Sequence, residues 1–402
     1  MYILNKNISR IHFIESLCYV FMNDDFQFIK ANEVETIFLK ECLNTNDLSL
    51  IIRNINDIYK INDDVLVSNT IKNVIETLDM CVKITDECNN SFYDILVTGE
   101  SEKKFPKTIQ IYLTNQCPHK CIHCFKGCVE KIINIDQSVL FSMLDFIKFK
   151  TPQIQLTGGE PLLYPHIYEL IEQYSKYFDI YITTSGYYLN NRILKLLTKC
   201  KEIQISLYSH IEDVHNNFVK NDNSFLNITK NIDILVSHNI NVGISHIVTP
   251  FNYFQIEDFI KYCILLKVNY IKFSNIIPLG RAKDKKEYIL TPQIKEKVKY
   301  SILKLKEKYK KEIYIFAWEG NNYGIKNNNF ICGAGSISWS INEKGDIYPC
   351  AMLECDQLKK GNIYNKDYIN IINNSMKEKY NKRFSDIKIN DITIDKICGD
   401  HE

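Results

Sequence analysis

The first 95 residues alternate hydrophobic and polar positions in a pattern that predicts a strand pair followed by three helices. Two runs rich in aromatic and β-branched residues, 18–22 and 26–29, flank an Asn-Asp-Asp sequence with turn chemistry. Asn32 and Glu35 form the pattern of a capping box at the start of the first helix. Apolar residues at helical spacing then predict helices over 32–43, 47–59 and 63–78. A hairpin with three short helices is typical of a winged-helix-like domain.

Between residues 107 and 274, short β-branched runs alternate with amphipathic helices, a pattern that predicts βα units around a parallel sheet. The six expected strands are 108–114, 153–157, 180–184, 202–207, 241–248 and 270–274. Six units predict an α/β fold with a partial (βα)6 TIM-like barrel, whose functional groups lie on loops after the strands. A basic helical segment, 281–311, leads to a third region with little other expected regular structure.

The composition supports a chain of several domains. With 402 residues, 45% of them hydrophobic, the chain can form two or three cores. We expect a winged-helix-like domain over 1–95, the barrel over 105–285 and a cysteine-rich domain over 310–402. A formal charge of +1 does not indicate nucleic acid or membrane as a main partner. Without a bilayer-spanning apolar run or a secretory signal pattern, we expect a cytoplasmic protein.

Fourteen cysteines in a chain with these features favour metal, cluster or redox chemistry over a disulfide framework. Four lie within twelve residues, namely Cys117, Cys121, Cys124 and Cys128. Four more lie in the last 71 residues, namely Cys332, Cys350, Cys355 and Cys398. The remaining six stand among apolar neighbours, and we interpret them as packing thiols.

The first group follows the first barrel strand directly. Cys117, Cys121 and Cys124 have spacers of three and two residues. Three thiolates on one loop can converge on one iron–sulfur cluster and leave one metal corner without a protein ligand. A closed structural zinc site is the alternative, and it would need Cys128 or His123 as its fourth ligand.

The loop after the second strand reads Thr-Gly-Gly-Glu-Pro over residues 157–161. Gly158 and Gly159 let a backbone approach a ligand closely, and Glu160 can accept a hydrogen bond from an ammonium group. Together with the three-cysteine loop one βα unit earlier, this sequence resembles the radical S-adenosylmethionine (SAM) enzymes. The resemblance implies a [4Fe-4S] cluster on the three cysteines and a methionyl amine held by the Gly-Gly-Glu residues.

The resemblance continues through the barrel. His123 takes the aromatic position before the last cysteine, Ser206 resembles the polar group near the SAM ribose, and Arg281 would neighbour the methionyl carboxylate. Taken alone, such a serine or arginine is more typical of a solvated or capping side chain. The implied reaction is reductive cleavage of SAM to methionine and a 5′-deoxyadenosyl radical, which removes hydrogen from a substrate carbon. The sequence identifies no further catalytic residue.

The second cysteine group resembles the SPASM and twitch domains, which carry auxiliary iron–sulfur clusters. Cys332 is followed after twelve residues by Gly345 and after four more by Cys350. A complete SPASM domain has more cysteines than the Cys355 and Cys398 that remain, so we expect one auxiliary cluster with these four cysteines as ligands. A zinc ribbon or a set of buried thiols is the alternative.

Residues 15–90 resemble the precursor-peptide recognition element of enzymes that modify ribosomally made peptides. Such elements add a leader peptide as a strand to their sheet edge. A DNA-binding winged helix is the competing interpretation. Its candidate recognition helix carries Asp63, Asp64 and Glu76 against Lys72, which does not fit a nucleic-acid surface.

These resemblances together predict a radical SAM maturase that acts on a precursor peptide and receives electrons from a reductant such as flavodoxin or ferredoxin. The expected product is a thioether between a cysteine sulfur and an α-carbon, the linkage of sactipeptides, and that step rests on analogy alone. Carbon–carbon cross-linking, epimerisation and sulfatase maturation use the same initiating radical and stay open. A non-enzymatic iron–sulfur regulator that binds DNA would leave the Gly-Gly-Glu-Pro loop and the six βα units unexplained.

Overall fold

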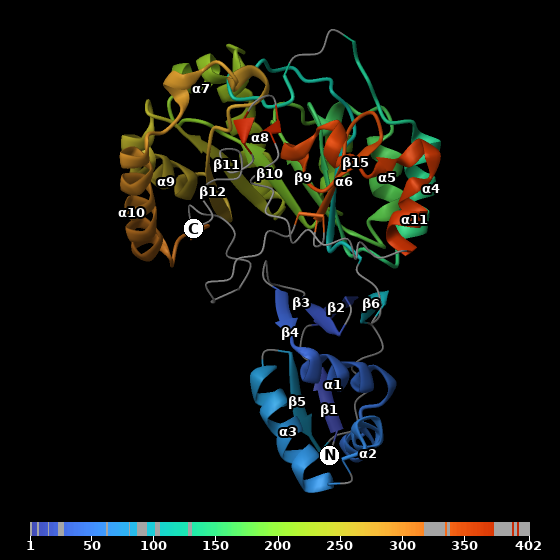
Figure 1. Ribbon diagram of the computed structural model, residues 1–402. Coiled ribbons are helices and arrows are strands. Elements are labelled where there is room, and N and C mark those ends of the chain that lie inside the picture. The colour runs from blue at the N-terminus through green and yellow to red at the C-terminus, as the bar shows by residue number, and fades with distance from the viewer. Residues whose placement is uncertain are drawn as a thin grey trace. The chain divides into compact units, whose positions relative to one another are not determined.

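The computed structural model divides the chain into two compact units (Figure 1). The first comprises Met1–Phe105 with Phe149–Pro152, and the second comprises Pro106–Lys148 with Gln153–Glu402. The described residues are 2–5, 8–14, 16–22, 28–61, 63–79, 81–86, 95–100, 105–127, 131–316, 334–335, 338–373, 388–389 and 392–393. Within them, no helix combines the length and the apolar character that a bilayer crossing requires.

A four-stranded sheet in the order β4-β3-β2-β6 forms one side of the first unit. Its strands are β2 (Ile8–Ile14), β3 (Leu17–Met22), β4 (Phe28–Ala31) and β6 (Leu96–Glu100). The predicted hairpin is confirmed as the antiparallel pair of β3 and β4. The sequence did not predict β2, β6 or the separate antiparallel pair of β1 (Tyr2–Asn5) and β5 (Val82–Thr85).

The three predicted helices of the first unit are confirmed as α1 (Glu33–Asn44), α2 (Leu48–Tyr59) and α3 (Asp64–Thr77). The capping box at α1 is complete, because Asn32 and Glu35 each accept a hydrogen bond from the other's backbone N–H. Phe38 of α1 packs in one apolar core with residues of α2, α3 and the sheet. The unit therefore has a core of its own.

The second unit is built on a ten-stranded sheet in the order β13-β12-β11-β10-β9-β8-β7-β14-β15-β16. Its six predicted strands are confirmed as β7 (Thr108–Tyr112), β8 (Gln153–Thr157), β9 (Asp179–Thr184), β10 (Glu202–Ser206), β11 (Val242–Val248) and β12 (Tyr270–Asn275). Each pairs in parallel with its neighbour. The predicted α/β barrel with a parallel sheet is thereby confirmed.

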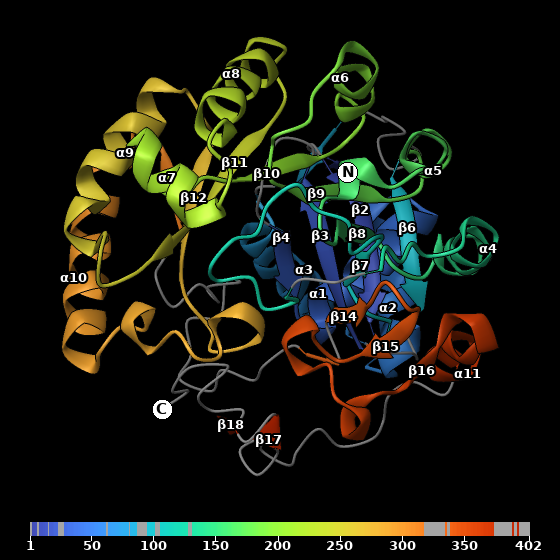
Figure 2. The ribbon, with the colours of Figure 1, turned by 90° about the horizontal axis from the view of Figure 1, so that it is seen from above.

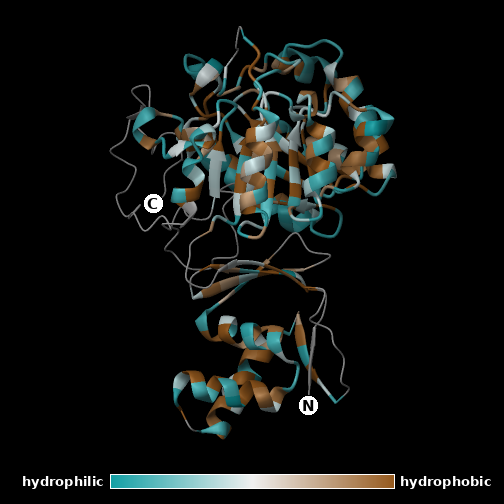
Figure 3. Ribbon diagram, turned by 90° about the vertical axis from the view of Figure 1, so that its right-hand side faces the viewer, coloured by the Kyte–Doolittle hydropathy of each residue, from teal (hydrophilic) through white to brown (hydrophobic). Residues whose placement is uncertain are grey.

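Helices connect these strands. They are α4 (Gln137–Ile147), α5 (Ile167–Tyr174), α6 (Asn191–Leu197), α7 (Glu212–Val219), α8 (Ser224–Ser237), α9 (Ile256–Leu265) and α10 (Pro292–Tyr309). Figure 2 shows α5, α6, α8 and α9 around the outside of the curved row of strands. In Figure 3 the helices carry mixed hydrophobic and hydrophilic positions, as helices with one buried face do.

The strands alternate buried apolar and polar positions, which gives the sheet two different faces. Ile109, Ile111 and Leu156 are fully or almost fully buried. On the alternate positions, Gln110 donates from Nε2 to Oε1 of Gln155 over 3.2 Å, and Gln155 donates onward to Thr183 over 2.8 Å. One face therefore packs against helices, and the other carries a ladder of polar side chains.

The third region of the chain contributes strands that the sequence did not predict. Parallel pairing joins β13 (Tyr314–Ile315) to β12, and it joins β14 (Ser338–Ile341) to β7. The antiparallel strands β15 (Asp346–Tyr348) and β16 (Gly361–Asn362) extend the sheet beyond β14. The remaining elements are α11 (Asp367–Asn373) and the pair β17 (Lys388–Ile389) and β18 (Ile392–Thr393). The sheet thus gains strands at both edges from this region.

Short 3-10 helices lie in the connections of the second unit. They are η1 (Pro161–Leu163), η2 (Tyr253–Gln255), η3 (Gly280–Ala282), η4 (Lys286–Tyr288), η5 (Ala351–Leu353), η6 (Asp356–Leu358) and η7 (Ile363–Asn365). Four of them, η1, η3, η5 and η6, carry or follow residues that the sequence singled out.

Candidate functional site

The loop after β7 carries Cys117, Cys121 and Cys124 at the carboxyl end of the parallel strands, and none of the three is in a disulfide. Its backbone is tied to the end of α7, because the Lys120 and Ile122 N–H groups donate over 3.0 Å to carbonyls of that helix. The polypeptide around Cys121 is therefore held in place by main-chain hydrogen bonds.

The electrostatics around these thiols favour the protonated form. The Cys117 residue as a whole is exposed. Its sulfur is nevertheless largely removed from water, and this burial raises the pKa of the thiol to about 12. Burial also raises the pKa of Cys121 well above its ordinary value. A metal must replace these protons to bind. Within the described ranges no three His, Cys, Asp or Glu side chains are grouped to hold a single ion. Three is the number of protein thiols that an iron–sulfur cluster with one open corner takes.

The Gly-Gly-Glu loop after β8 lies directly against the start of the cysteine loop. Gly159 N–H donates to Thr114 O and Glu160 N–H donates to Gln116 O, both over 2.7 Å. A Cβ on Gly158 or Gly159 would lie 2.3 Å from one of these two carbonyl oxygens, and Gly158 also has a φ of +144°. Both glycines are thus required by the close approach of the two loops.

Glu160 is fully buried, and four donors surround its carboxylate. Thr184 Oγ1 donates over 2.6 Å, Ser185 N over 2.8 Å and Leu162 N over 3.1 Å, and the Ser185 hydroxyl also donates. Burial raises the pKa of Glu160, and these hydrogen bonds oppose that shift. Glu160 therefore joins the start of η1 to the end of β9, a structural link that the sequence did not predict.

His123 lies in a partly buried pocket of aromatic side chains. Its ring stacks on Phe218 with centroids 5.1 Å apart and an interplanar angle of 13°. Its Nε2 is 3.1 Å from the Tyr208 hydroxyl, and its buried Nδ1 has no partner within the described residues. Burial, with Arg281 nearby, lowers the pKa of His123 to about 4, so the ring is neutral near pH 7. An unpartnered ring nitrogen fits a site that receives a polar ligand.

Ser206 and Arg281 both connect to the cysteine loop. Ser206 hydrogen-bonds the Tyr208 hydroxyl, which also contacts His123. Arg281 donates from Nε to Cys121 O over 2.8 Å and from its backbone N–H to Cys124 O over 3.0 Å. The structure therefore brings these two predicted site residues together with the predicted cluster ligands. Arg281 binds backbone carbonyls of the cysteine loop, and the position of Arg281 in the sequence could not indicate these hydrogen bonds.

The second cysteine group also lies beside this loop. Cys350 and Cys355 pack with Phe125 and Leu279 in one apolar cluster. Lys126, two residues after Cys124, forms ion pairs with Glu354 over 2.5 Å and Glu343 over 3.1 Å. The loop and the third region of the chain are thus joined by apolar and ionic contacts. Cys128, Cys332 and Cys398 lie outside the described residues.

The sequence did not single out Tyr208, His119, His215 or Ser224, which form buried or partly buried hydrogen bonds next to the cysteine loop. The sequence feature that could have indicated these contacts is the presence of two histidines, His119 and His123, between the loop cysteines. Their partners follow β10 and lie about a hundred residues later in the chain, so only the fold brings them together.

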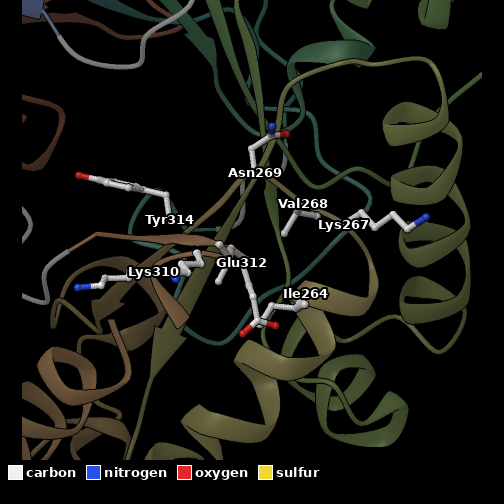
Figure 4. A pocket seen from close by; sticks show the side chains of 9 residues that line it. Ile264, Lys267, Val268, Asn269, Lys310, Glu312 and Tyr314 are labelled. Atoms are coloured by element: carbon white, nitrogen blue, oxygen red, sulfur yellow. The ribbon is translucent and has the colours of Figure 1, made fainter. Parts of the chain in front are cut away.

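A pocket of about 460 Å3 lies away from these residues (Figure 4). It is lined by Ile264, Lys267, Val268, Asn269, Lys310, Lys311, Glu312, Ile313 and Tyr314. These residues lie at the amino-terminal ends of β12 and β13, whereas the cysteine loop follows the carboxyl end of a parallel strand. The pocket is therefore not part of the candidate site.

Comparisons with known proteins agree with the geometry. Residues 111–263 match the model of the Radical SAM superfamily. The antilisterial bacteriocin subtilosin biosynthesis protein AlbA of Bacillus subtilis is 26% identical over 300 residues, covering 72% of this chain and 64% of AlbA, less than two thirds of its length. The uncharacterized protein MJ0907 of Methanocaldococcus jannaschii is 29% identical over 307 residues, covering 69% of this chain and 96% of that protein.

Solved structures are similar over most of the chain. The crystal structure of Streptococcus suis SuiB bound to precursor peptide SuiA has a TM-score of 0.64 and 17% sequence identity. The match covers 92% of this chain and 86% of that chain. At this identity, the likeness supports the fold.

Proposed function

We propose that this chain, in which residues 111–263 form a radical SAM domain, is an enzyme that modifies a ribosomally synthesised precursor peptide. The domain implies a [4Fe-4S] cluster and SAM as cofactors. The observation that supports this proposal most strongly is a contact between two loops. Backbone hydrogen bonds join the three-cysteine loop to the Gly-Gly-Glu loop at the carboxyl ends of β7 and β8. The relationship to AlbA, named for subtilosin biosynthesis, and the fold of SuiB, solved with a precursor peptide, support a peptide as substrate.

The chain's own residues would hold and orient the cofactors. When bound, the cluster and SAM supply a 5′-deoxyadenosyl radical that removes a hydrogen atom from a substrate carbon. Cys117, Cys121 and Cys124 would hold the cluster. Gly158, Gly159 and the backbone of Glu160 would face the methionyl amine in this proposal, because the Glu160 carboxylate is buried and already accepts from four donors. His123, Ser206 and Arg281 would face the rest of SAM. Neutral His123, with an unpartnered Nδ1, suits a ligand that has a polar edge.

The modification that we propose is a thioether between a cysteine sulfur and an α-carbon of the peptide. Its formation removes a hydrogen atom from the carbon and a proton from the thiol, and one electron is left over. Cys332, Cys350, Cys355 and Cys398 would hold an auxiliary iron–sulfur cluster, which would supply an acceptor for that electron. The packing of Cys350 and Cys355 beside Phe125 supports a position close to the first cluster.

We propose that the peptide's leader binds to the first unit. Within the described residues, β4 has β3 as its one neighbour, so its other edge is open to a further strand. The domains of this proposal are residues 1–95 for the leader, 105–285 for the radical chemistry and 310–402 for the auxiliary cluster. We place the enzyme in the cytoplasm with flavodoxin or ferredoxin as its reductant, since reduced thiols persist there.

Anaerobic reconstitution tests the proposal. The protein would be loaded with iron and sulfide and given SAM, dithionite and a synthetic peptide translated from a short reading frame beside its gene. We expect 5′-deoxyadenosine from the wild type and from Cys200→Ala, a matched control at a half-buried thiol outside the site. We expect none from Cys121→Ala. The peptide should lose the mass of one hydrogen molecule, and the loss should require its cysteine.

Three results would contradict the proposal at different levels. Absence of 5′-deoxyadenosine from the wild type, with its clusters intact, would argue against the radical chemistry and favour the DNA-binding regulator. Cleavage of SAM with a peptide mass change that is independent of cysteine would favour carbon–carbon cross-linking or another modification. An unchanged mass with altered α-carbon stereochemistry would indicate epimerisation.

A further inference from the structure

We propose that the segment after β10 forms a clamp that sets the shape of the three-cysteine loop before a cofactor binds. The clamp consists of Tyr208, His215 and Ser224, and it holds His119 and His123 of the loop. The proposal gives these five residues a positioning role. It rests on the proposed function only where it assigns the iron–sulfur cluster to this loop.

The first hold runs from Tyr208 to His119 through two buried side chains. The Tyr208 backbone N–H donates to His215 Nδ1 over 3.2 Å. His215 Nε2 is 3.0 Å from Ser224 Oγ, and Ser224 Oγ is 3.1 Å from His119 Nε2. His119 lies between Cys117 and Cys121, so this chain of hydrogen bonds ends on the loop itself.

The hydrogens in this chain have one consistent arrangement. A backbone N–H can only donate, so His215 Nδ1 is the acceptor. Burial lowers the pKa of His215 to about 3, so its ring is neutral. His215 must then carry its proton on Nε2 and donate to Ser224, whose hydroxyl donates to His119 Nε2. Every group along the chain is therefore satisfied.

The second hold is on the other side of Cys121. The Tyr208 hydroxyl contacts His123 Nε2 over 3.1 Å, and the Phe218 ring stacks on the imidazole. Between the two holds, the Lys120 and Ile122 N–H groups donate to Val219 and Phe218 carbonyls. One segment of 17 residues, 208–224, thus contacts the loop on both sides of its middle cysteine and along the backbone between.

Because these side chains are buried, the loss of any of these hydrogen bonds should destabilise the loop. His215 and Ser224 are 0% exposed and His119 is 4% exposed. A buried donor or acceptor that loses its partner has no water to replace it, so removal of one link leaves the neighbouring groups unsatisfied. The loop would then open locally more often, which hydrogen exchange of its amides measures.

The experiment uses the full chain without cofactors. Amide exchange of the peptide containing Lys120 and Ile122 would be followed by mass spectrometry in wild type, Ser224→Ala and Ser224→Thr. The matched control is Ser340→Ala, since Ser340 is buried and its hydroxyl has no partner within the described residues. We expect about tenfold faster exchange in Ser224→Ala, wild-type exchange in Ser340→Ala and partial recovery in Ser224→Thr. After reconstitution, Ser224→Ala should also release iron to a chelator faster than the control does.

Wild-type exchange of the loop in folded Ser224→Ala would overturn the clamp. If Ser224→Ala does not fold, His119→Ala removes the loop's side of the first hold and leaves the 208–224 segment intact. Unchanged exchange in that variant would likewise overturn the proposal, and faster exchange would support it. Because the readout needs neither SAM nor peptide, failure of the proposed peptide chemistry leaves this result unaffected.

Discussion

Glu160 has four hydrogen-bond donors around a carboxylate that solvent does not reach. The donors come from η1 and from the end of β9, so one side chain fixes the relative position of two loops at the carboxyl ends of the strands. The close approach of the cysteine loop to Gly158 and Gly159 also restricts the position of the Gly-Gly-Glu loop. At the scale of residues, the candidate site is thus shaped by backbone contacts as much as by the side chains that would meet SAM.

A buried histidine near the carboxyl ends of the barrel strands makes the free energy of unfolding depend on pH. His246 is buried, donates from Nδ1 to Leu207 O over 3.1 Å and has Asn252 Nδ2 3.3 Å from Nε2. Burial lowers its pKa from an ordinary value of 6.5 to about 3, although the bond to Leu207 opposes the shift. Below pH 6.5 the unfolded chain therefore binds a proton that the folded chain does not.

His246 thus contributes stability that is present above pH 6.5 and is lost as the pH falls toward 3. We expect that His246→Gln makes the fall in unfolding free energy between pH 6 and 5 shallower by about 1.4 kcal/mol per pH unit. Urea titrations of the apoprotein at several pH values would measure this. His238→Gln on the surface is the control and should keep the wild-type slope. An equal slope in all three proteins would contradict the expected contribution.

The sequence predicted those elements that form because of a local pattern of residues. It did not predict elements that form only because they pair with a distant part of the chain. The strands β7 to β12 are apolar runs bounded by turn residues, and Asn32 marks the start of α1 through local hydrogen bonds. In contrast, β13 to β16 have two to four residues each and exist because they pair with strands elsewhere in the chain. The same holds for the site, since the spacing indicated the loop cysteines but not Tyr208 or Ser224.

Helix caps provide a matched test at the scale of elements. Asn190 caps α6 by accepting from Ile193 N over 2.8 Å, whereas Asn223 precedes α8 without a side-chain cap bond. We expect Asn190→Ala to cost about 1 kcal/mol of stability and Asn223→Ala to stay within about 0.5 kcal/mol of wild type. Denaturant unfolding of both variants would measure the difference. Equal costs would show that the side-chain bond at Asn190 does not stabilise the helix.

At the scale of the whole molecule, the two units have separate cores. The core of the first unit includes Phe38, Ile51 and Ile71, and all of its members lie in that unit. The apolar clusters around Tyr208 and around Leu279 lie wholly in the second unit. Leader recognition and radical chemistry, as proposed, would therefore depend on different cores.

Phe38→Ala tests that separation. Phe38 is 1% exposed, so its truncation should destabilise the first unit by about 3–5 kcal/mol. We expect SAM cleavage without peptide to stay at the wild-type rate, while modification of a full precursor peptide falls at least tenfold. Calorimetry and product analysis on the same samples would measure both effects. A parallel loss of SAM cleavage would mean that the second unit depends on the core of the first.

The pairing of β14 with β7 has a consequence for how the protein is made. Ser338 pairs with Thr108, about 230 residues earlier in the chain. At about 5–20 residues per second, a ribosome needs on the order of ten seconds or more to travel that distance. Throughout that interval the strand that leads into the cysteine loop has an open edge. The progress of translation therefore sets the earliest moment at which β7 can be paired on both sides.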